Sequence, residues 1–122
     1  MTRTAPIPAR QTRMEMQKPV LYHAVTRADW DAQFDGTRYD TPDRQRTGFI
    51  HLSFAHQVEP TLERFFSGVA DVLVVEIDPD LLTDLRCEDL YGHGTFPHHY
   101  GPIPAAAIIR IEPRDSRNPH GN

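Results

Sequence analysis

The residues of this chain best suited to chemistry are its histidines, of which there are seven in 122 residues. His23 and His51 each lie within a short run of branched and aromatic residues that is typical of a β-strand. Imidazole titrates near neutral pH, so histidines that converge on one cleft can act as general acids or bases, or hydrogen-bond a ligand. A second interpretation stays open, in which these two histidines are structural and bond the backbone.

A second pair of histidines, His98 and His99, lies in the stretch TFPHHYGPIP at 95–104. Proline lacks an N–H and glycine favours turns, so this composition predicts a rigid loop rather than a helix or a central strand. Neighbouring side chains of an extended chain point to opposite sides. We therefore expect only one histidine of the pair to share a cleft with His23 and His51.

Other kinds of site find little support in the sequence. There is no HxxxH pair or CxxC knuckle, so no metal site is expected. The single cysteine, Cys87, lies between Arg86 and Glu88 in a predicted strand, not at the helix N-terminus that commonly activates a thiol. Glycine-rich phosphate loops of the GxGxxG and GxxxxGK[ST] types are also absent from the sequence.

Composition narrows the class of protein. A hydrophobic content of 39% with 25% charged residues is ordinary for one globular domain. One cysteine allows no internal disulfide, which favours a reducing compartment and predicts a cytoplasmic protein. The net charge is −4, and basic residues gather near both ends, so the acidic middle argues against a nucleic-acid partner. No apolar run approaches the ~20 residues that span a membrane.

The elements that must position these residues follow from hydrophobic period and turn residues. We predict one α+β domain at 19–112, with a split, mainly antiparallel sheet and two main helices. A disordered leader is expected at 1–18 and a flexible tail at 113–122. The strands are expected at 20–25, 48–53, 71–78, 85–90 and 105–112. One helix is expected from Thr26 to near Gly36, and a second, capped by Ser53, is expected to run to Phe66. An exposed loop is expected at 35–47 and a helical turn at 79–85.

Three blocks together resemble a known family: LYHAV at 21–25, GFIHLS at 48–53 and FPHHYGPI at 96–103, with VLVVEID at 72–78 and Glu88 in fitting places. They are similar to the bacterial family called domain of unknown function 952. The chain departs from that family's pattern at His99, where an aliphatic residue is usual, and at Phe54-Ala55, where Thr-Pro is common. The resemblance therefore implies that His98, rather than His99, shares the cleft with His23 and His51. The family is remotely similar to the ADP-ribosyltransferase fold, which binds NAD in a cleft between two small bent sheets.

The resemblance implies roles for particular residues. His23 matches a first motif that bonds the nucleotide ribose, while His51 and Ser53 match a second that lines the nicotinamide. The third position, which supports group transfer, falls to Glu88 or to the loop with His98. Aromatic rings that could sandwich a flat ligand ring are those of Tyr22 and Tyr100.

The implied ligand is NAD or a related nucleotide, and the implied enzyme is an ADP-ribosyl transferase or an NAD-cleaving hydrolase. The alternative is a module that binds a small molecule or nucleotide without catalysis. The sequence gives no indication of oligomeric state.

Overall fold

The computed structural model of the protein describes residues 19–115. The leader expected at 1–18 lies outside the described residues, as does the tail from residue 116 onward. What the structure describes is a small α+β domain with antiparallel sheets and few helices, as the sequence predicted. None of the described helices is long and apolar enough to cross a membrane.

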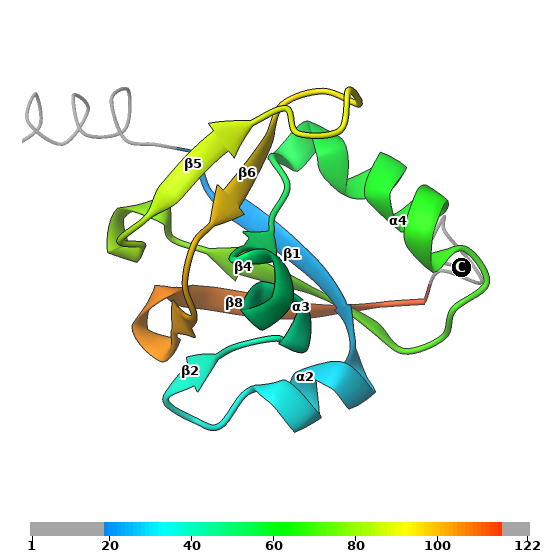
Figure 1. The fold of residues 1–122 in the computed structure, drawn as a ribbon. Helices are drawn as coiled ribbons and strands as arrows, with labels where there is room; N and C mark the ends of the chain where they lie inside the picture. The colour runs from blue at the N-terminus through cyan, green and yellow to red at the C-terminus, as the bar shows by residue number, and fades with distance from the viewer. Residues whose placement is uncertain (1–18, 116–122) are drawn as a thin grey trace, which may run out of the picture.

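The first sheet has three antiparallel strands in the order β1-β4-β8, namely β1 (Leu21–Thr26), β4 (Val72–Ile77) and β8 (Ile108–Arg114) (Figure 1). β4 is central and almost wholly buried, as its continuous apolar sequence predicted. β8 starts later than predicted because Ala105–Ala107 forms the 3-10 turn η3, and it extends through Pro113 and Arg114, which the sequence assigned to the tail.

β8 is an edge strand with an irregular register. Glu76 pairs with Arg110 and Ile77 with Ile108, so Ile109 is an extra residue that forms a bulge. The side chains of Ile109 and Ile111 are 52% and 40% exposed.

The second sheet corrects the prediction of a loop at 95–104. Phe96–His99 is strand β6, central in this sheet between β3 (Ile50–His51) and β5 (Leu85–Glu88), and Ile103–Pro104 is strand β7 of a separate, two-stranded sheet. Pro97 is tolerated in a central strand because its carbonyl accepts from Leu52 N at 2.9 Å, so that only the reciprocal bond is missing.

The stretch 35–47 is likewise not an exposed loop. It holds strand β2 (Arg38–Tyr39), which pairs with β7, and a third helix, α3 (Pro42–Thr47). Tyr39 is only 1% exposed and stacks on Trp30 with ring centroids 4.7 Å apart. This buried ring anchors a segment whose other residues are mostly polar.

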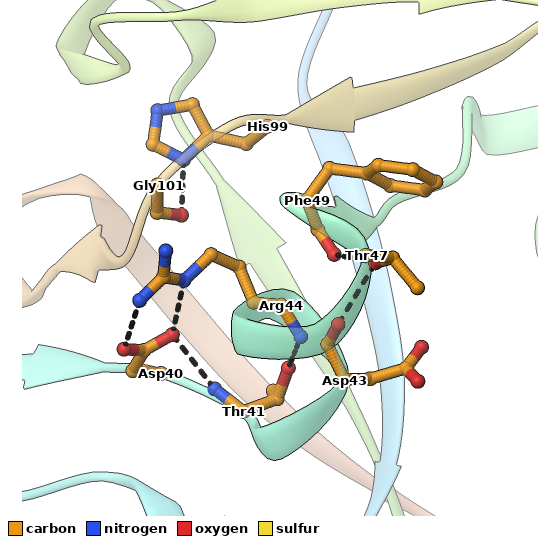
Figure 2. Close-up of polar contacts among 8 residues, drawn as sticks. All are labelled: Asp40, Thr41, Asp43, Arg44, Thr47, Phe49, His99 and Gly101. Atoms are coloured by element: carbon orange, nitrogen blue, oxygen red, sulfur yellow. Dashed lines mark hydrogen bonds and ion pairs between the residues drawn. The ribbon is translucent and has the colours of Figure 1, made fainter.

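Helix α3 has well-defined ends. At its start the Thr41 hydroxyl accepts from Arg44 N at 2.8 Å (Figure 2). Gly48 ends the helix with φ 101°. The Arg44 guanidinium donates twice to the Asp40 carboxylate, at 2.7 Å each, and hydrogen bonds from Arg44 hold the pKa of Asp40 below its ordinary value. These local contacts fix the start of α3 and join it to the end of β2.

The two main helices begin differently from each other. α2 (Arg27–Gln33) starts as predicted, with the Thr26 hydroxyl accepting from Asp29 N at 3.1 Å, but it is shorter than expected. α4 (Val58–Phe66) ends where predicted, but Ser53 does not cap it, because the 3-10 turn η1 (Ala55–Gln57) intervenes. A further 3-10 turn, η2 (Pro79–Leu81), fills the predicted turn after β4.

Alternate residues of β4 face two cores, one on each side of the first sheet. On one side Val72 and Val74 pack against Leu62 of α4. On the other side Leu73 and Val75 belong to the same buried cluster as Ile50 and Leu52 around β3. The second sheet therefore lays one face on the first sheet and leaves its other face to form a site.

Candidate functional site

His51, His98 and Glu88 lie on the outer face of the second sheet. His51 pairs directly with His98, so both side chains point to one face, and their rings meet edge to face at 4.9 Å. Phe49 stacks on His98 at 4.3 Å. His98 is 1% exposed, so neighbouring rings hold the imidazole in one orientation.

His99 belongs to the opposite face of this sheet. Its Nδ1 donates to the Gly101 carbonyl at 2.9 Å (Figure 2). His99 Nε2 is the one buried side-chain nitrogen or oxygen, among residues 19–115, that lacks a hydrogen-bond partner. Burial lowers the pKa of His99. The alternation expected for an extended chain thus places His98, and not His99, beside His51.

A cavity of about 480 Å³ adjoins this face of the sheet. Five of the residues singled out in the sequence line it: His23, His51, Ser53, Glu88 and His98.

The two tyrosines singled out in the sequence are not among the lining residues. Tyr22 alternates with His23 along β1 and packs against the α4 core, while Tyr100 lies behind Glu88. Reasoning from sequence missed Thr61, Arg64, Tyr91 and Phe96 as lining residues. For Thr61 and Arg64 a signal exists, since their spacing puts both on one face of a helix.

The central polar feature of the cavity is a carboxylate–histidine pair. His98 Nδ1 lies 3.0 Å from Glu88 Oε1, and the Tyr100 hydroxyl donates to the same oxygen at 2.7 Å. Hydrogen bonds from His98 and then Tyr100 lower the pKa of Glu88, so the carboxylate is ionised at neutral pH. Since a carboxylate only accepts, Nδ1 is the nitrogen that carries the proton. His98 Nε2 makes no hydrogen bond within the described residues, which leaves it available to a ligand.

A second layer holds Tyr100 in place. The Arg86 guanidinium lies 4.0 Å from the centroid of the Tyr100 ring, and Arg86 also pairs with Asp84 at 2.9 Å. The carboxylate of Glu88 is thus oriented from behind by a chain of charged and aromatic groups.

His23 is fixed by the protein at both ring nitrogens. Nδ1 donates to the His51 carbonyl at 2.8 Å, and Nε2 lies 2.8 Å from the Tyr39 hydroxyl. Burial lowers the pKa of His23 to about 4, so the ring is neutral at pH 7, and the Tyr39 hydroxyl donates to Nε2. Burial raises the pKa of Tyr39, which keeps that hydroxyl protonated. His23 therefore forms a rigid, neutral wall, and Tyr39, which the sequence placed in an exposed loop, is its partner.

A second cavity of about 560 Å³ lies on the other side of His23 and His51. Both residues line this cavity as well as the first. His51 is exposed between them, and burial followed by the nearby His98 lowers its pKa. Within residues 19–115 there is no group of three or more histidine, cysteine or acidic side chains placed to hold a metal ion.

The fold and site define a small α+β domain of paired antiparallel sheets, with a cleft lined by histidines and an ionised carboxylate. Residues 24–111 match the family described as protein of unknown function (DUF952), and the chain belongs to this family.

Similar structures are those of the protein CC0527 from Caulobacter crescentus. Its X-ray crystal structure is 31% identical in sequence with a TM-score of 0.69, covering 79% of this chain and 86% of that one. Its solution NMR structure is also 31% identical, with a TM-score of 0.68, covering 79% and 84%. No curated protein matches the chain.

Proposed function

We propose that this protein is an enzyme similar to ADP-ribosyltransferases, which binds NAD or a related nucleotide and transfers or hydrolyses its ribosyl group. The observation that carries the proposal is the Glu88–His98 pair at the wall of the cavity, where His98 Nε2 is available beside His51 and Ser53. A cavity of about 480 Å³ falls in the range of roughly 300–1,000 Å³ common for small-molecule sites.

The chemistry suits these groups. When the bond between nicotinamide nitrogen and ribose C1′ breaks, its electron pair leaves with nicotinamide and positive charge develops on the ribose. An ionised carboxylate behind a histidine stabilises that charge through the hydrogen bond from His98 to Glu88. In hydrolysis a water adds to C1′, and His51, which lines the same cavity and whose pKa is lowered by burial, accepts the proton that the water releases.

In this proposal His23 does not bind the ribose directly. Both of its ring nitrogens are bonded to the protein, so its role is to shape the wall shared by the two cavities. The ligand's polar contacts fall instead to His51, Ser53 and His98.

A second function, binding without catalysis, is favoured by one observation. Glu88 Oε1 already accepts from both His98 and Tyr100, so the carboxylate is engaged without any ligand. A binding module of this kind keeps its affinity in Glu88→Gln and releases no nicotinamide. The enzyme releases nicotinamide at a measurable rate, and Glu88→Gln abolishes that rate.

The test of nucleotide binding uses asparagine as a partial mimic of histidine. His98→Asn keeps a donor near the position of Nδ1 for Glu88 and removes Nε2. Calorimetric titration with NAD and ADP-ribose should show binding to the wild type, and at least about tenfold weaker binding to His98→Asn.

The matched control is His99→Asn, which keeps a donor for the Gly101 carbonyl on the opposite face of the sheet. It should bind as the wild type does. Absence of heat with either ligand at millimolar concentration would remove the proposal, as would equal loss of affinity in both variants.

A further inference from the structure

Hydrogen-bond donors gather on the α4 side of the cavity. Thr61 and Arg64 are three residues apart on α4, and both line the cavity, so they share one helix face. The Ser53 hydroxyl lies 3.4 Å from that of Thr61 and lines the same wall. Two hydroxyls and a guanidinium together form a surface that can donate several hydrogen bonds to one group.

Arg64 has a charge that the described part of the chain does not neutralise. Its guanidinium makes no ion pair among residues 19–115 and lies over the Phe65 ring, 5.3 Å from the centroid. Arg46, which lines the second cavity, is paired with Asp43, and Arg86 is paired with Asp84. In a chain with a net charge of −4, an unneutralised cation at a cavity is a local exception.

Acceptors gather on the side of β5 and β6. Glu88 is ionised and His98 Nε2 carries a lone pair whenever the ring is neutral, because Nδ1 holds the proton. The polar groups of this mainly apolar cavity are therefore divided between two walls, with donors and positive charge on α4 and acceptors and negative charge on β5 and β6.

We propose that the ligand is a phosphorylated sugar, whose phosphate binds Ser53, Thr61 and Arg64 while a sugar hydroxyl donates to His98 Nε2. Phosphate oxygens at neutral pH only accept, and arginine binds them with charge-assisted bonds. A sugar hydroxyl supplies the donor that the opposite wall lacks. This inference rests on the proposed nucleotide-binding function, and it sets the direction in which the nucleotide lies in the cavity.

The test uses two nucleotide fragments that differ by one phosphate: nicotinamide mononucleotide and nicotinamide riboside. The wild type should bind the mononucleotide at least about tenfold more tightly. Arg64→Gln should abolish that preference and leave the affinity for the riboside unchanged. Arg38→Gln removes an exposed arginine that lies outside the cavity, and it should keep the wild-type preference.

The outcomes separate this inference from the proposed function. A tenfold preference that survives in Arg64→Gln overturns the inference and leaves nucleotide binding standing, as does a wild type that binds both fragments equally. Where neither fragment binds, NMR titration with inorganic pyrophosphate decides. Amide shifts at Thr61 that vanish in Arg64→Gln support the anion site without the nucleotide function, and the absence of shifts overturns both.

Discussion

Acidification should destabilise the folded chain between pH 6.5 and 4 through His23. Burial lowers the pKa of His23 from 6.5 to about 4. In this interval the unfolded chain takes up a proton that the folded chain does not, so the free energy of unfolding falls as the pH falls. Each pKa unit is worth about 1.4 kcal/mol, so His23 should lower the free energy of unfolding by about 3 kcal/mol by pH 4.

Other titratable groups also make the free energy of unfolding fall on acidification, some of them in a lower pH range. Burial also lowers the pKa of His51 and His99, so these rings add to the loss above pH 4. Hydrogen bonds lower the pKa values of Asp40 and Glu88, so their stabilisation is present above the ordinary values of 3.8 and 4.5 and is lost below them. A variant of His23 itself is therefore needed to isolate its share.

The assay is urea unfolding from pH 7.5 to 4, followed by the fluorescence of Trp30, the single tryptophan, which is buried against Tyr39. His23→Gln keeps an acceptor for the Tyr39 hydroxyl near the position of Nε2 and cannot titrate. Its free energy of unfolding should fall by about 3 kcal/mol less than that of the wild type between pH 7.5 and 4.

His56→Gln removes an exposed histidine of η1 and should follow the wild-type pH dependence. If His23→Gln also follows the wild-type curve, the buried neutral histidine is not the origin of the acid sensitivity.

Two further changes test how the site is supported. Gly48→Ala should lower the free energy of unfolding in urea by about 1–2 kcal/mol, because φ is 101°; the new Cβ would make only an ordinary contact with the Tyr100 ring, at 3.6 Å. Gly36→Ala, with φ 91° and open space around it, should cost a similar amount, and a much smaller loss there would contradict the backbone explanation. Thr41→Ala should cost about 1 kcal/mol in the same assay, because it removes the cap on Arg44 N, and an unchanged midpoint would show that the cap does not stabilise α3.

The convergence of His23 and His51 could be predicted from sequence because it depends on strands and on the two-residue alternation of their side chains. Both are local properties of the chain. The choice of His98 over His99, in contrast, came from the family resemblance. The strand β6 could not be predicted in the same way. A proline in the sequence predicts the end of a strand. Only the position of Leu52 in the folded protein shows that Pro97 keeps one of its two backbone hydrogen bonds to that residue.

Tyr39 and Arg64 show the same limit for side chains. Residues 35–47 are rich in turn formers, and the burial of Tyr39 depends on Trp30 and His23, which come from other segments. Likewise, Arg64 becomes part of a donor wall only because α4 lies near Ser53, which follows β3 and bridges to Tyr22 of β1. Contacts between distant segments decide both cases, and a single sequence does not encode them in any local pattern.

The outer edge of β8 bears on how this protein behaves when it is crowded. Two exposed isoleucines on an edge strand invite a second chain to add a strand, which is how sheets template aggregates. Pro113 offers no N–H to such a chain, and the bulge at Ile109 interrupts the regular row of backbone groups. The strand therefore keeps an apolar, exposed edge while denying an incoming chain the continuous hydrogen-bond ladder on which fibrils grow.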